Sequence, residues 1–114
     1  SLDEDFNMVL YNDNGQVRLG LALKFKEEVA NPNEIIAPLE SSLPQGFAAL
    51  LYPADTSLPA AVTFGTGTYN NFPVRYANVA PEKMYSFDYI LQNKLFYIGN
   101  SKEVARKTFE AGVK

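Results

Sequence analysis

The side chains that could do chemistry in this chain are carboxylates, lysines, tyrosines and hydroxyls, because its 114 residues include no histidine and no cysteine. Histidine is the side chain that titrates nearest neutral pH, and cysteine gives the readiest thiolate nucleophile. Both are also common zinc ligands. The composition therefore excludes serine–histidine and cysteine–histidine catalysis, and we expect no catalytic residue, no metal site and no cofactor.

Paired carboxylates remain as a route to hydrolysis, since a glycosidase needs two acids about 5–10 Å apart across a cleft. The acids of this chain are clustered near its beginning, adjacent to each other, or isolated, as in Asp3-Glu4-Asp5, Glu27-Glu28, Asp55 and Asp88. Charged side chains are seldom buried without a partner. We therefore expect these acids to be solvated on the surface rather than paired across a cleft.

Asp88 is the acid for which two positions stay open. It shares one face of a predicted strand with Ser86 and Ile90, so either that face meets solvent or the acid is buried beside a hydrogen-bond donor or a lysine. We favour the exposed position because buried unpaired acids are rare. An enzyme is our third hypothesis for the function, and it would use Asp55 or Asp88 together with a lysine or a tyrosine.

The most suggestive binding feature is the segment 65–72, whose candidate binding residues are Tyr69, Asn70, Asn71 and Phe72. Two aromatic rings and two primary amides on a glycine-containing base can hold a sugar, a peptide or another subunit by stacking and hydrogen bonding. The alternative is a turn in which Tyr69 and Phe72 fold back into the core. We favour that alternative because large aromatic rings usually contribute buried area.

Two glycine-containing segments begin like ligand-binding loops but lack the residues that such loops need. Asn12-Asp13-Asn14-Gly15 starts like a calcium loop, yet position 21 is leucine where an EF-hand loop carries a glutamate. Gly65-Thr66-Gly67 has neither the lysine of a P-loop nor the third glycine of a dinucleotide site. We interpret the first segment as a hairpin turn and the second as a bend that ends a strand.

Alternating apolar and polar residues predict two hairpins. The segments 6–11 and 17–25 alternate with period two on either side of the first turn. Near the other end, 84–91 and 94–98 flank Gln92-Asn93 and predict a second tight hairpin.

Further apolar runs predict the remaining strands at 47–52, 61–64 and 72–79. The second hairpin places three aromatic residues on one face, Tyr85, Phe87 and Tyr89. We expect this aromatic face to pack beneath the C-terminal helix, because a sheet needs an apolar layer to cover it.

Capping residues predict two helices. Asn31 and Pro32 suit the start of the first helix, and Pro38 interrupts it because proline lacks the amide that bonds back along the helix. Asn100 is the predicted cap of the second helix, with Glu103 reaching back to it, and Gly112 suits its end.

Together these elements predict an α+β domain. It has a mainly antiparallel sheet of about five to seven strands, with a short broken helix (about 32–43) and a C-terminal helix (about 101–111) packed on one face. Residues 1–114 fit a single compact domain by length. The sequence leaves open whether this domain stands alone or is excised from a larger protein.

The distribution of charge limits the partners. The net charge of −3 comes from acids and bases spread through the chain, and this pattern argues against nucleic acid because phosphate recognition needs clustered Lys and Arg. No run approaches the roughly 20 apolar residues of a membrane span. The compartment stays unknown. The absence of cysteine fits the cytoplasm, and it also fits the cell envelope, the extracellular space or a virion. We favour these last three places over the cytoplasm.

Our leading hypothesis is a non-catalytic interaction or structural module that serves protein–protein recognition or assembly, as a domain of an envelope, surface or particle protein. Its partner would be a second copy or another protein chain. The alternative is a carbohydrate- or small-ligand-binding domain that uses Tyr69–Phe72. A β module without catalytic residues can also act by accepting a partner strand at an open sheet edge.

Overall fold

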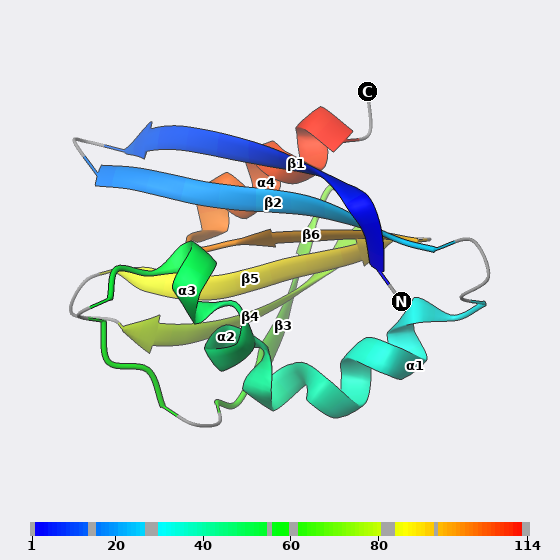
Figure 1. The fold of residues 1–114 in the computed structure, drawn as a ribbon, viewed down its shortest axis with the longest axis horizontal. Coiled ribbons are helices and arrows are strands. Elements are labelled where there is room, and N and C mark those ends of the chain that lie inside the picture. The colour runs from blue at the N-terminus through cyan, green and yellow to red at the C-terminus, as the bar shows by residue number, and fades with distance from the viewer. Residues whose placement is uncertain are drawn as a thin grey trace.

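Six strands form one antiparallel sheet in the order β1-β2-β6-β5-β4-β3 (Figure 1). The computed structural model describes residues 2–13, 16–26, 30–54, 56–59, 62–80, 84–92 and 94–112. The strands are β1 (Leu2–Asp13), β2 (Gln16–Phe25), β3 (Gly65–Tyr69), β4 (Phe72–Ala80), β5 (Tyr85–Gln92) and β6 (Leu95–Gly99). The predicted α+β class and mainly antiparallel sheet are confirmed, and the strand count lies within the predicted range.

Both predicted hairpins are present. Asp13 pairs with Gln16 where β1 meets β2, and Gln92 pairs with Leu95 where β5 meets β6. The residues Asn14, Gly15 and Asn93 of these turns lie outside the described part of the chain. The period-two alternation thus predicted the pairing of these strands from residue types alone.

A helical segment and a C-terminal helix complete the fold. The first consists of α1 (Pro32–Ile36), the 3-10 helix η1 (Ala37–Ser42), α2 (Leu43–Gly46) and α3 (Ala48–Leu51), and the second is α4 (Lys102–Gly112). The predicted broken helix is therefore present, and it changes to 3-10 geometry at Ala37, with Pro38 in the first turn of η1. It runs further than predicted, because Pro44 occupies an N-terminal position of α2, where proline is tolerated.

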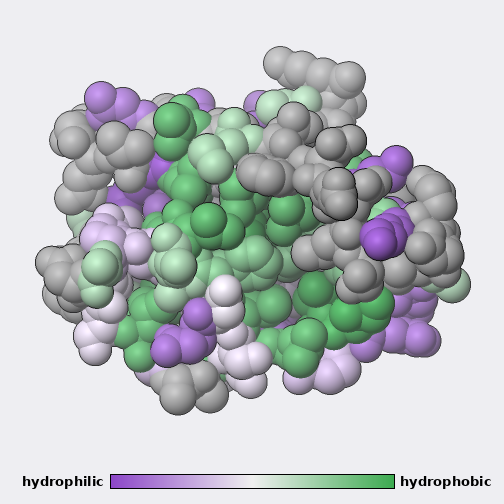
Figure 2. All heavy atoms as spheres, viewed as in Figure 1, coloured by the Kyte–Doolittle hydropathy of each residue, from purple (hydrophilic) through white to green (hydrophobic). Residues whose placement is uncertain are grey.

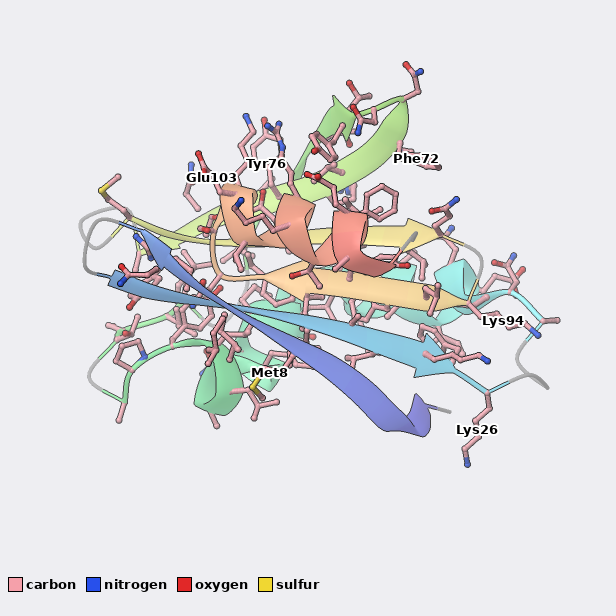
Figure 3. The ribbon with its side chains drawn as sticks, turned by 90° about the horizontal axis from the view of Figure 1, so that it is seen from above. Met8, Lys26, Phe72, Tyr76, Lys94 and Glu103 are labelled. Atoms are coloured by element: carbon pink, nitrogen blue, oxygen red, sulfur yellow. The ribbon has the colours of Figure 1, made fainter. Side chains whose placement is uncertain are left out.

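The two helical segments cover opposite faces of the sheet, so the prediction that both pack on one face is wrong (Figures 1 and 3). The α1–α3 segment contributes Ile36, Leu43 and Leu51 to the core that also contains Phe87 and Phe96. Helix α4 packs on the other face, against β2, β6 and β5. Since the strands are apolar on both faces here, one helical layer could not have buried them.

The aromatic residues of the second hairpin divide between the two faces accordingly. Phe87 and Tyr89 pack with Phe96 in the core beneath α1–α3, and not beneath α4 as predicted. Tyr97 points to the other face, where its ring lies 5.1 Å from that of Phe109 on α4. Alternation along β6 places these neighbours in separate cores.

Two predicted strands are absent. The run 47–52 contains the helix α3, in which Leu51 is buried and Leu50 is exposed, because alanine and leucine form helices as readily as they fill a core. Residues 62–64 form no strand, and β3 begins at Gly65, where a bend was predicted. The chain turns instead at Asn70-Asn71, and both residues have positive φ.

Asn100 braces the end of the sheet instead of capping α4 as predicted. Its side-chain amide donates to the carbonyl of Leu51 at 2.7 Å, and its carbonyl oxygen accepts from the amide of Leu19 at 3.1 Å. Ser101 caps the helix, since its hydroxyl oxygen accepts from the amide of Val104 at 3.3 Å. The buried Asn100 side chain therefore connects β2 and α3 at the point where α4 begins.

Candidate functional site

The candidate residues Tyr69, Asn70, Asn71 and Phe72 form the turn between β3 and β4 and its two flanking positions. Asn70 and Asn71 are exposed, whereas Tyr69 and Phe72 are half-buried against α4. Phe72 lies 5.0 Å from the ring of Phe109. The two rings therefore pack against α4. The assignment of a ligand to this turn stays a prediction.

Tyr69 is held by two residues of α4. Its hydroxyl donates a hydrogen bond to Glu110, and the guanidinium carbon of Arg106 lies 4.7 Å from its ring centroid. The hydrogen bond to Glu110 raises the pKa of Tyr69. The Tyr69 ring thus serves as a platform for Arg106, an arrangement that fixes the plane of a guanidinium.

A cavity of about 390 Å³ lies next to this platform, between α4 and the strands β3, β4 and β5. We call it the α4 cavity, and the residues that matter for its chemistry are Val74, Tyr76, Ser86, Asp88, Lys102 and Arg106. Tyr76 and Phe72, both labelled in Figure 3, extend from β4 on the side of the sheet that carries α4. The volume is within the usual range for small-molecule sites.

Asp88 lies in the wall of this cavity and is only 3% exposed, so the favoured prediction that it is solvated is wrong. Its carboxylate accepts a hydrogen bond of 2.5 Å from the hydroxyl of Ser86. Burial raises the pKa of Asp88, although the Ser86 hydroxyl and the charges of Lys102 and Arg106 oppose this effect. The acid has the buried position beside donors that the sequence left as the alternative.

Lys102 and Arg106 are the functional candidates that sequence reasoning missed. They are four residues apart on α4, so they lie on one face of the helix and both reach the cavity. Neither forms an ion pair with Asp88 within 4.0 Å among the described residues. Their spacing on a predicted helix was visible in the sequence, but the strands that α4 covers were not.

Asp55, the other acid considered for catalysis, lies outside the described residues. The described residues contain no group of three or more acidic side chains that could hold a metal ion. Within the same part of the chain, no helix has the length and apolar character needed to cross a membrane.

A second polar cluster lies on the opposite face of the sheet. Arg75 forms a two-pronged ion pair with Glu40, at 2.7 Å from Nε and 2.6 Å from Nη2, and Tyr89 donates to Glu40 at 2.6 Å. The hydrogen bond from Arg75 lowers the pKa of Glu40, and burial raises the pKa of Tyr89. Because every partner belongs to this chain, the cluster is best explained as a clamp that holds η1 on β4 and β5.

The edge strand β1 carries two exposed apolar side chains, Met8 and Leu10. It pairs with β2 on one side, and no described strand pairs with its other side. Met8 is 51% exposed and Leu10 is 68% exposed. They pair with Leu21 and Leu19, so all four belong to the face that α1–α3 only partly covers.

These side chains contribute to an apolar surface. Figure 2 shows apolar residues gathered in the middle of the face on which Figure 1 places β1, β2 and α3. Leu50 on α3 is 57% exposed, and Leu19 and Leu23 on β2 are half-buried. Exposed apolar surface of this kind marks interaction sites on many soluble proteins.

A comparison with protein-family models, with curated proteins and with solved structures found no match to this chain. Two features of the fold are candidate binding sites, the α4 cavity and the open edge of β1.

Proposed function

We propose that this domain is a non-catalytic recognition module that binds an extended segment of another protein along β1. The observation that carries the proposal is the open edge of this strand, which has 12 residues and a sheet partner on one side among the described strands. The outer amides and carbonyls of such a strand can pair with an added strand. The added segment would become the seventh strand of the sheet.

Side chains on β1 would give the added strand its specificity. Met8 and Leu10 lie on one face of β1, and residues at alternate positions of a partner would pack beside them. Met8, labelled in Figure 3, extends toward the side of the sheet opposite α4. The partner therefore requires apolar side chains at every second position.

The charge of β1 indicates which partner fits. Its sequence contains four acids, Asp3, Glu4, Asp5 and Asp13, and neither lysine nor arginine. A second copy pairing here would bring like charges together, which is unfavourable across a strand pair. A segment of another protein, with alternating apolar residues and lysine or arginine at its ends, is complementary in both respects.

Binding of short labelled peptides tests this proposal. One peptide alternates valine and threonine between terminal lysines, and the second has glutamates in place of the lysines. Fluorescence anisotropy measures their affinity for the native domain, for the double variant Met8→Lys/Leu10→Lys, and for Leu39→Lys. Leu39 is a matched control because it is also 51% exposed but lies on η1.

We expect the lysine peptide to bind more tightly than the glutamate peptide. The double variant should weaken its binding about tenfold or more, since covering the two side chains contributes roughly 1 kcal/mol each. Leu39→Lys should leave the affinity unchanged. Equal loss in both variants, or no binding by either peptide, would contradict the proposal. So would a dimer in light scattering that the Met8→Lys/Leu10→Lys change dissolves, because a second copy would then be the partner.

A further inference from the structure

The α4 cavity is independent of β1, since it lies at the other end of the strand order, between α4 and β3, β4 and β5. It combines one buried acid with two cations and an apolar wall. Among the described residues, Asp88 accepts a hydrogen bond from Ser86 and forms no ion pair with Lys102 or Arg106, whose charges act on it from a greater distance. A buried charge without an ion-pair partner weakens the fold and so calls for another explanation.

The positions of the charges define a ligand with two opposite groups. Asp88 can accept a hydrogen bond from an ammonium group, and Lys102 and Arg106 can hold a carboxylate. Stacking on Tyr69 leaves the edge of the Arg106 guanidinium available for two parallel hydrogen bonds. A simple anion would leave Asp88 without a cationic partner, and a simple cation would lie beside Lys102 and Arg106, whereas a ligand with both charges matches all three side chains.

The remaining wall fits a small aliphatic group. Val74, Ile90 and Ala105 line the cavity from β4, β5 and α4. These side chains are buried and apolar, so they favour a ligand part that has no hydrogen-bonding groups of its own.

We propose that the α4 cavity binds a small zwitterion, an aliphatic amino acid, with its ammonium group on Asp88 and its carboxylate on Lys102 and Arg106. The side chain of the amino acid lies against Val74 and Ile90. This assignment requires no reaction, and it does not depend on strand addition at β1.

The test is a titration of the labelled domain, followed by NMR, with L-alanine, L-valine, L-leucine and β-alanine as probes. N-acetyl-L-leucine lacks the ammonium group and L-leucinamide lacks the carboxylate, so each removes one of the two charges. The variants are Asp88→Asn, Arg106→Gln and Lys102→Gln. Lys107→Gln is the matched control, because Lys107 belongs to the same helix but does not line the cavity.

We expect at least one of the four amino acids to shift the amide signals of Ile90 and Ala105, and both capped forms of leucine to bind at least tenfold more weakly than leucine. Arg106→Gln and Lys102→Gln should each weaken the binding of the best probe several-fold, and Lys107→Gln should not. Asp88→Asn should remove the discrimination against N-acetyl-L-leucine. Thermal unfolding of each variant shows whether it is folded. If Asp88→Asn does not fold, Lys102→Gln and Arg106→Gln still test the proposal, because both residues lie on α4 outside the core.

Three results would overturn the assignment. The first is the absence of shifts at the cavity with all four amino acids. The second is N-acetyl-L-leucine or L-leucinamide binding as tightly as leucine. The third is an equal effect of Lys107→Gln and Lys102→Gln, which would show that only the overall charge of α4 matters.

Discussion

Gly20 and Gly99 lie opposite each other in the β2–β6 ladder, and α4 crosses over both of them. A Cβ atom at Gly20 would lie 2.0 Å from Oγ1 of Thr108, and one at Gly99 would lie 2.7 Å from the backbone nitrogen of Ala105. Glycine at both positions lets the helix approach the sheet closely. Because α4 carries Lys102 and Arg106, this glycine pair also sets the position of the α4 cavity.

Gly99→Ala should lower the free energy of unfolding by about 2 kcal/mol or more, because the helix backbone must move to admit the methyl group. Gly46→Ala is the control, since nothing lies within 4 Å of a Cβ there, and it should be neutral or slightly stabilising. Urea unfolding measures both variants. Equal stabilities of the two would show that α4 does not rest on Gly99.

Removing the hydroxyl from Tyr97 and from Tyr52 should change the stability of the domain in opposite directions. Tyr97 is fully buried, and its hydroxyl has no hydrogen-bond partner among the described residues. Tyr52 donates to the carbonyl of Ser86 at 2.6 Å. In thermal unfolding, Tyr97→Phe should therefore stabilise the domain and Tyr52→Phe should destabilise it, each by about 1 kcal/mol. The reverse order would contradict the buried environment assigned to Tyr97.

Asp88→Asn should stabilise the domain at neutral pH. Burial raises the pKa of Asp88 in the folded state, against the opposing effects of Ser86, Lys102 and Arg106, so the folded state binds this proton more tightly than the unfolded chain does. The acid therefore costs stability above its folded pKa and costs nothing below the unfolded value. We expect a gain in the free energy of unfolding at pH 7 that disappears on acidification. A gain independent of pH would show that the carboxylate charge is not the cause.

Glu40 should show the opposite dependence. The hydrogen bond from Arg75 lowers the pKa of Glu40, so its contribution is present above the unfolded pKa and is lost as the pH falls through the folded value. Glu40→Gln should cost about 1 kcal/mol at neutral pH, a modest value because Arg75 is partly exposed. A double-mutant cycle with Arg75→Gln measures the coupling. A coupling energy near zero would show that the Arg75–Glu40 ion pair does not hold η1 on the sheet.

Local patterns predicted two of the hairpins and the C-terminal helix. The β1–β2 and β5–β6 hairpins and α4 depend on alternation, turn residues and helical spacing, which the sequence shows directly. The wrong predictions concern contacts between elements that are distant in the sequence. The apolar run 47–52 is compatible with a strand and with a helix. In the structure it forms a helix, which buries Leu51 in the core.

The candidate site was harder to predict for the same reason. Asp88 was recognised as unusual, but its burial depends on α4, which begins only at Lys102, after β6. Nothing in the local sequence says which face of β5 that helix covers. The alternation of segment 6–11 likewise predicted a strand with one apolar face. The exposure of Met8 and Leu10 on that face follows from where the α1–α3 segment ends, which the alternation does not show.

Hydrogen exchange of the β1 amides tests the open edge most directly. In residues 6–13 the register with β2 is unbroken, so amides that bond to β2 alternate with amides that point outward. The account predicts alternating slow and fast exchange in the free domain, and selective slowing of the fast set when the lysine peptide binds. Uniform protection of β1 in the free domain, or bound peptide that protects another region and leaves these amides unchanged, would contradict it.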